Sequence, residues 1–278
     1  MRNRGAWILA AGVGISPAAN ADNKLFITDV LDPGQMETQE TLRFSKSSQV
    51  SFTFPSGSTG GGNRRTIRFT ASLGGGVAEG FQVDASIPYA FVDKESNEVN
   101  GVPTPADHSG IGDLDLGFKY RLAGTEQGSY VTTARLDIKP QTADMTEQGT
   151  GATSYTLELA TSFRVGQSLR PFGFFDATYR TNGQGDSFVL GIGAEEAFSE
   201  KLTATLEASA VKNAASNSTS GYDATSVSLS VYLQTLRNLY LIPALGYTWY
   251  GEIPGINGFA TVSKQTVKAA SLGLYYLF

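Results

Sequence analysis

Polar and apolar residues alternate without a break in the stretch GDLDLGFKYRL, from Gly112 to Leu122. Successive side chains of an extended strand point to opposite faces, so one face of this stretch is entirely apolar and the other carries the charges. A strand buried on both sides would be apolar on both faces. The alternation therefore predicts an amphipathic strand that separates a polar from an apolar environment.

The same two-residue period recurs along the chain and predicts about twelve strands. An even number of antiparallel strands is typical of single-chain bacterial barrels. The predicted strands cover residues 36–54, 66–73, 81–91, 112–122, 130–138, 155–165, 175–179, 188–194, 202–208, 227–233, 239–249 and 270–278.

The longest apolar run is too short to be a transmembrane helix. It covers Ala6–Ile15, whereas a helix needs about 18 or more apolar residues to cross a bilayer. Arg2 and Arg4 precede the run and the small-residue stretch SPAANA follows it, which predicts an export signal over residues 1–21 with cleavage after Ala21. The chain has no cysteine, so no disulfide stabilises the exported protein.

Net charge and composition narrow the partners. The net charge is -5 and no basic run occurs, which argues against nucleic-acid binding, because phosphate contacts need clustered Lys and Arg. The 32 Gly, 16 Phe and 12 Tyr residues favour an all-β protein with aromatic residues at membrane interfaces. Outer-membrane lipid is therefore the predicted surrounding of the apolar faces.

The links between predicted strands alternate in length. Links such as DKESNEVNGVPTPADHSGI fall on one side, and links as short as GQS or SE fall on the side of both termini. Outer-membrane barrels place short turns in the periplasm and long loops outside, with aromatic girdles at both rims. These features favour a transmembrane antiparallel up-and-down β-barrel over residues 36–278, with periplasmic termini. A soluble sandwich or lipocalin-like barrel is the alternative.

Four motifs resemble a known family in order and spacing: DVLDPGQMETQETLRFSKSS, GFQVDASIPYAF, GIGDLDLGFKYRL and TGATSYTLELATSF. They are similar to segments of the outer-membrane transporters of the MetA-pathway of phenol degradation family, from about Val30 to the C-terminus. The resemblance implies an outer-membrane channel linked with uptake of aromatic or other hydrophobic compounds. A PTGD-like stretch of the family reads KPQTAD here, Lys139 to Asp144, and no site residues carry over.

The inward parity of the predicted strands collects charges of both signs, so strong ion selectivity is not predicted. Two interpretations stand side by side: these side chains line a pore, or they pair across strands and fill the barrel. The candidates are Arg68, Lys119, Arg121, Arg135, Lys139, Arg164 and Arg180 with Asp84, Asp113, Asp115, Asp137, Glu158, Asp176, Glu195 and Glu207.

The two ends of the mature chain carry apolar residues. The segment 22–35 contains Leu25, Phe26 and Ile27, and one hypothesis is that it folds into the lumen as a hatch; a docked tail or short extra strand is the alternative. At the other end, the strand AASLGLYYLF should pair with the first strand, because a closed barrel leaves no open edge. The resemblance to bacterial barrels implies that the barrel-assembly machinery recognises Phe278.

Nothing in the sequence indicates catalysis, a metal or a cofactor. The one histidine, His108, lies between Asp107 and Ser109, and adjacent residues cannot form a triad with one another. The segment DKESNE lacks calcium-loop spacing and is predicted to be a solvated loop. We therefore predict a passive channel for small, hydrophobic or aromatic solutes. A non-conducting barrel that anchors a protein partner is the main alternative, and a hydrolase is less supported.

Overall fold

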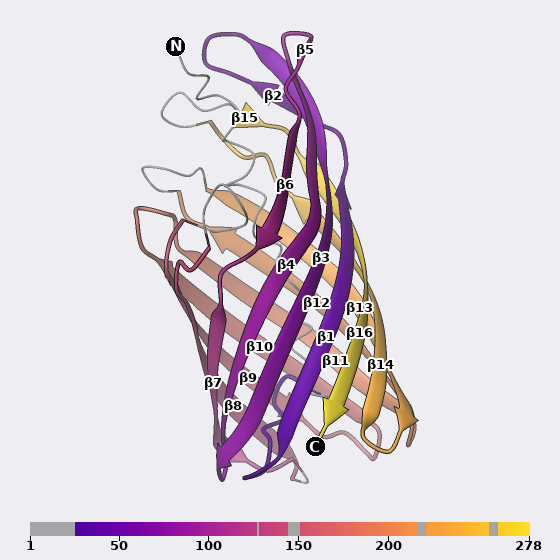
Figure 1. Cartoon of the computed structure of the whole chain (residues 1–278). Coiled ribbons are helices and arrows are strands. Elements are labelled where there is room, and N and C mark those ends of the chain that lie inside the picture. Colours follow the sequence, from indigo (N-terminus) through magenta and orange to yellow (C-terminus); the bar gives the residue numbers. More distant parts are fainter. Residues whose placement is uncertain (1–25, 127, 144–150, 216–220, 256–260) are drawn as a thin grey trace.

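The computed structural model describes residues 26–126, 128–143, 151–215, 221–255 and 261–278. The predicted export signal, residues 1–21, and Leu25 lie outside the described residues. No helix in the described ranges is long and apolar enough to span a membrane. Twelve long strands form a closed antiparallel barrel (Figure 1): β1 (Met36–Ser47), β3 (Thr59–Ala78), β4 (Phe81–Val99), β7 (Asp115–Gly124), β8 (Tyr130–Lys139), β9 (Ser154–Phe163), β10 (Leu169–Arg180), β11 (Ser187–Ser199), β12 (Leu202–Asn213), β13 (Tyr222–Leu236), β14 (Leu239–Tyr250) and β16 (Gln265–Leu277).

The last strand closes the barrel. Each long strand pairs with its neighbour along the chain, and β1 pairs with both β3 and β16. At the end of this seam, the Phe278 backbone N–H donates to the Met36 carbonyl oxygen over 2.7 Å. Closure gives every strand two partners, so backbone groups are satisfied without water. The predicted fold class and strand number are confirmed.

The two ends of the barrel differ in their connections. At the turn end, β1 begins, β16 ends, and short turns such as residues 200–201 join the strands. At the loop end, the links are long, as in residues 100–114 between β4 and β7. The predicted alternation in link length is therefore confirmed. The long links also contain four short strands, β2 (Val50–Thr53), β5 (Val102–Pro103), β6 (Ala106–Ile111) and β15 (Thr261–Val262).

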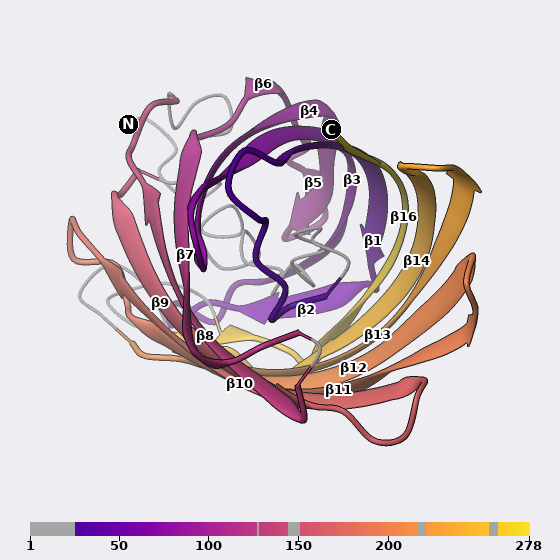
Figure 2. The same cartoon turned by 90° about the horizontal axis from the view of Figure 1, so that it is seen from below.

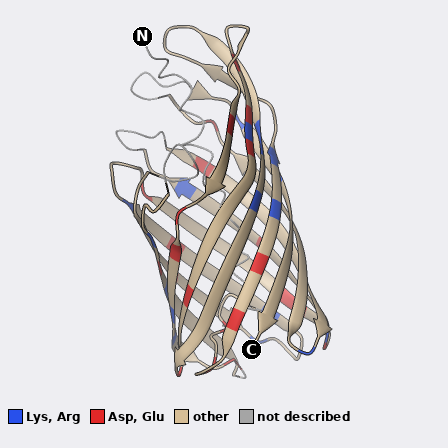
Figure 3. Ribbon diagram, in the orientation of Figure 1, with Lys and Arg blue, Asp and Glu red and all other residues tan. Residues whose placement is uncertain are grey.

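The two faces of the barrel wall differ in polarity. On β16, Leu272 and Leu274 are 50% and 40% exposed on the outside, whereas Tyr275 beside Leu274 is 2% exposed. Charged residues occupy a small part of the strands (Figure 3). Exposed aromatic rings stack between neighbouring strands on the outer face, Tyr155 on Tyr179 and Phe175 on Phe188. The exposed band is thus apolar and aromatic, as the alternation predicts.

One strand departs from its predicted bounds in a way that changes the lumen. β4 continues to Val99, and an irregularity between Ala90 and Asp93 shifts its register. Asp93, Glu95 and Asn97 consequently point inward, where they are buried. The prediction of a solvated DKESNE loop is wrong, because the strand runs beyond the apolar band and both of its faces are polar there.

Candidate functional site

The described residues that precede β1 lie inside the lumen at the turn end. Seen along the barrel, the segment that begins at Phe26 curls inside the ring of strands (Figure 2). Lys119 Nζ on β7 donates to the Asp29 carbonyl oxygen over 2.7 Å. Arg170 Nη2 on β10 donates to Asp29 Oδ1 over 2.8 Å, and the Leu31 N–H donates to Gln82 Oε1 on β4 over 3.1 Å. Strands from different sides of the barrel therefore hold residues 26–35, here called the lumen segment.

An aromatic cluster anchors the lumen segment. Phe26 is buried and meets the edge of Phe172, with 5.2 Å between ring centroids. The Arg170 guanidinium carbon lies 3.9 Å from the centroid of the Phe26 ring, a cation–π geometry. Ile27 packs against the same cluster. These contacts place Phe26 and Ile27 inside the barrel. Whether the lumen segment acts as a hatch stays a prediction.

Glycines on β11 make room for the aromatic rings of β10. A Cβ added at Gly191 would lie 2.1 Å from the Phe174 ring, and one at Gly193 would lie 2.4 Å from the Phe172 ring. No side chain other than hydrogen fits at these distances. The aromatic rings therefore lie flat over the inner wall of β11 and narrow the lumen beside the lumen segment.

Carboxylates gather on the inner wall next to this aromatic cluster. Asp176 lies four residues further along β10 than Phe172, and its Cα partner on β9 is Glu158. It also interacts electrostatically with Asp137 on β8 and Glu207 on β12. The Asp176 Oδ1 atom is buried and has no hydrogen-bond partner among the described residues. This group of four is called the acidic wall.

Arg135 lies beside the acidic wall and neutralises part of it. Its Nη1 and Nη2 donate to the two carboxylate oxygens of Asp84 over 2.9 and 2.7 Å. Its Nε donates to Asp137 Oδ1 over 2.7 Å. A guanidinium fork is suited to such two-point contacts. Arg135 therefore pairs with Asp84 across strands, from β8 to β4, and with Asp137 along its own strand.

Arginines occupy the facing side of the barrel. Arg43 on β1 and Arg68 on β3 are Cα partners, and Arg64 lies four residues before Arg68 on β3. Arg64 Nε donates to Asp93 Oδ1 over 2.6 Å, and its Nη2 contacts Asp93 Oδ2. In the order of the strands around the ring, β1 lies six steps from β10. This group of three, the basic wall, thus stands half-way round the barrel from the acidic wall.

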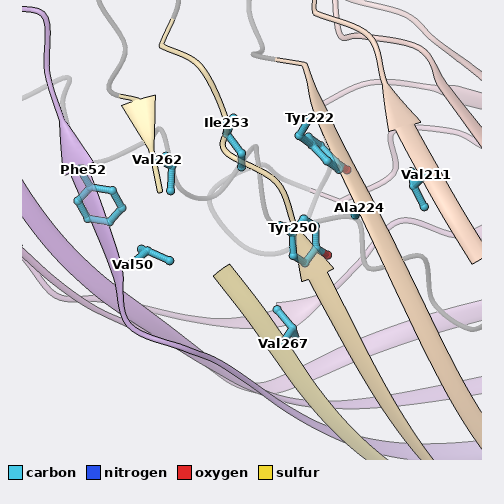
Figure 4. Close-up of a cluster of buried hydrophobic side chains, with 9 residues drawn as sticks. All are labelled: Val50, Phe52, Val211, Tyr222, Ala224, Tyr250, Ile253, Val262 and Val267. Atoms are coloured by element: carbon cyan, nitrogen blue, oxygen red, sulfur yellow. The ribbon is translucent and has the colours of Figure 1, made fainter. Parts of the chain in front are cut away.

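A second apolar cluster lies at the loop end of the lumen (Figure 4). Tyr222 and Tyr250, inner residues of β13 and β14, have ring centroids 5.8 Å apart. The short strands β2 and β15 pair with each other and bring Phe52 and Val262 into the same cluster. The cluster also contains Val50, Val211, Ala224, Ile253 and Val267. The side chains of β2, β15 and the inner wall therefore narrow the loop end of the lumen.

The remaining predicted lumen residues are distributed along the inner wall. Arg121 forms an ion pair with Glu126. The others make the following contacts: Asp115 to Lys139 at 4.0 Å, Glu195 to Arg170 at 3.7 Å, and Arg180 to Gly185, Ser187 and Asn213. Most of these contacts join neighbouring strands or link a strand to its turn.

Two candidates lie outside the strand interior. Arg164 follows the end of β9, is exposed, and donates through Nη2 to the Glu126 carbonyl oxygen over 2.6 Å. Asp113 precedes β7 and accepts hydrogen bonds from the Thr142 and Ala143 N–H groups at 3.0 and 2.9 Å. Whether Arg164 and Asp113 line the lumen stays a prediction, although Asp113 is buried and Arg164 is exposed.

Comparison with solved structures identifies barrels of the same fold. The chain superposes on the COG4313 outer membrane channel from Pseudomonas putida F1 with a TM-score of 0.65 and 10% identity, over 92% of this chain and 99% of that one. It superposes on the KdgM porin with a TM-score of 0.50 and 11% identity, over 85% of this chain and 98% of that one. Such low identities show the fold alone.

Sequence comparison adds no family assignment. No family model matches the chain, and no curated protein is similar to it in sequence. The structural likeness is consistent with the resemblance to the phenol degradation family, and membership stays a prediction.

Proposed function

We propose that the protein is an outer-membrane channel for passive diffusion or uptake of small solutes. The observation that carries the proposal is the inverted barrel wall: large apolar side chains are exposed outside, whereas the charged and polar side chains are buried inside. A soluble barrel would show the reverse. The shared fold with an outer membrane channel supports this function. The turn end, at which β1 begins and β16 ends, would face the periplasm.

The lumen favours small solutes with an apolar or aromatic part. Phe172 and Phe174 line the turn-end cluster, and Tyr222 and Tyr250 line the loop-end cluster. Aromatic rings attract flat apolar solutes by stacking and edge contacts. Polar solutes and ions that cross the lumen would also pass the charged side chains of the acidic and basic walls.

The lumen segment would regulate passage as a hatch at the periplasmic end. Phe26, Thr28, Val30 and Leu31 of the segment are buried, and hydrogen bonds from the segment reach β4, β7 and β10. A solute would pass when the segment leaves this position.

Planar-bilayer recordings test the proposal. The mature protein is expected to show discrete current steps, and deletion of residues 22–33 should enlarge them or raise their frequency. Small aromatic solutes should reduce the ionic current as they occupy the lumen. The channel proposal would be refuted if neither the wild-type protein nor the deletion variant gives current steps.

A non-conducting barrel that anchors a partner is the second candidate. The filled turn end favours it, because Phe26, Thr28 and Val30 are 3%, 0% and 4% exposed. An enzyme has less support: Asp107 beside His108 forms an exposed ion pair with Lys94 at 3.2 Å. The absence of catalysis, metal and cofactor stays a prediction, although no three acidic or histidine side chains of the described part are grouped to hold a metal ion.

A further inference from the structure

A polar hollow lies at the loop end of the lumen, beside the loop-end apolar cluster. It is lined by Ser47, Val50, Gly62, Asn63, Arg64, Glu95, Asn97 and Gln265, from β1, β2, β3, β4 and β16. Its non-protein space is about 220 Å³ including the part open to solvent. The enclosed part has room for about one water-sized group.

Two hydrogen-bond donors of the hollow have no acceptor. Gln265 is 3% exposed, and its Nε2 is buried without a partner among the described residues. The same holds for Arg64 Nη1. A buried donor without an acceptor is costly. An acceptor from outside the chain, placed in the hollow, would satisfy both donors.

The guanidinium of Arg64 is fixed before any ligand arrives. Asp93, 1% exposed, holds Nε and Nη2, which leaves Nη1 as the free donor. Glu95 also lines the hollow, but Arg64 Nε at 3.8 Å and Asn97 Nδ2 at 3.0 Å face its carboxylate. Arg68 lies outside the lining but interacts electrostatically with Arg64 and Asp93, and Arg43 is its Cα partner. The basic wall, which consists of Arg43, Arg64 and Arg68, therefore exceeds Asp93 and Glu95 by one positive charge. The site thus favours an anion.

The neighbours of the hollow are apolar. Val50 belongs both to the hollow and to the loop-end cluster. Tyr250 is the Cα partner of Gln265 across β14 and β16 and packs against Tyr222. A ligand whose anionic group occupies the hollow would therefore have aromatic and aliphatic side chains next to its remainder.

We propose that the Arg64–Gln265 hollow binds the carboxylate group of a small aromatic or aliphatic acid at the loop-end entrance of the lumen. Gln265 Nε2 and Arg64 Nη1 donate to the carboxylate oxygens. The inference deepens the proposed function, since it names the solute class that this entrance would select.

Binding is tested on the folded, detergent-solubilised full chain, without transport. Benzoate, benzamide and benzylammonium have similar size and differ in charge, and calorimetric titration gives their affinities. Benzoate should bind about tenfold or more tightly than benzamide, as expected for hydrogen bonds to a charged group. Equal binding of all three probes, or preference for benzylammonium, would overturn the proposal.

Matched variants locate the site. Gln265→Leu removes the amide donor, and Arg64→Lys keeps the charge next to Asp93 while removing the fork. Each should weaken benzoate binding about tenfold, whereas Arg65→Lys, on the exposed outer side of the same strand, should not. Unchanged affinity in Gln265→Leu and Arg64→Lys, with circular dichroism showing folded barrels, refutes the site. Benzoate binding by a protein that is silent in bilayers would instead refute only the channel.

Discussion

Truncation of Phe26 to alanine should release the lumen segment. The ring is 3% exposed, contacts Phe172 edge-on, and lies under the Arg170 guanidinium. Loss of a buried Phe side chain in a protein core costs about 3–5 kcal/mol. The whole cost falls on the docked state, because the ring makes these contacts only when the segment lies in the lumen.

At the lower bound of about 3 kcal/mol, the ratio of undocked to docked segment rises about 100-fold, since about 1.4 kcal/mol is a factor of ten. If docking closes the lumen, the fraction of time spent in the larger-conductance state rises by the same factor while that fraction is small. Single-channel recordings of the mature Phe26→Ala variant measure it directly.

Phe175→Ala is the matched control. This ring also lies in the aromatic part of β10, near Phe172, but it is 45% exposed on the outer face. Its loss should leave the dwell times unchanged. Wild-type dwell times in Phe26→Ala, together with an increase on deletion of residues 22–33, would show that the ring does not hold the segment. Unchanged dwell times in both would refute closure by the lumen segment.

Three further predictions concern assembly and stability. Deletion of Phe278 removes the hydrogen bond that ends the seam with β1 and should lower the yield of assembled barrel in membrane fractions, with normal conductance in the barrels that assemble. Gly193→Ala should lower the thermal unfolding temperature, because its Cβ would clash with the Phe172 ring at 2.4 Å; a wild-type temperature would contradict that packing. Arg135→Met should cost about 3–5 kcal/mol by leaving its carboxylate partners without their cation, whereas Arg135→Lys should cost less in the same denaturation assay.

The outer wall could be predicted from the sequence because lipid and lumen impose opposite demands on alternate residues. Leu272 and Leu274 are exposed, whereas the alternate residues Gly273 and Tyr275 are buried. The sequence AASLGLYYLF places large apolar residues at the exposed positions 272, 274 and 276. The assignment of residues to the two faces also does not depend on the exact residues at which a strand begins and ends. Strand number, link lengths and outward aromatic residues were accordingly predictable.

The arrangement of the inner side chains was not predictable in the same way. Asp93 and Glu95 were missed because β4 changes parity between Ala90 and Asp93, a shift that hydropathy does not record. Arg43 lies in a strand whose residues are too polar to assign a face. Which inner residues meet depends on the register between strands, and register is set by contacts between residues far apart in the chain.

Register also decides how the charges of the lumen act. Like charges lie side by side on each wall, as Arg43 and Arg68 do on one and Glu158 and Asp176 on the other. Because β1 and β10 are six steps apart in a ring of twelve strands, the two groups cannot neutralise one another by contact, and their field crosses the lumen instead. Such a field in a narrow, low-dielectric passage is stronger than in bulk water. A solute with a negative end would therefore be turned with that end toward β1 and β3, the side on which the Arg64–Gln265 hollow lies.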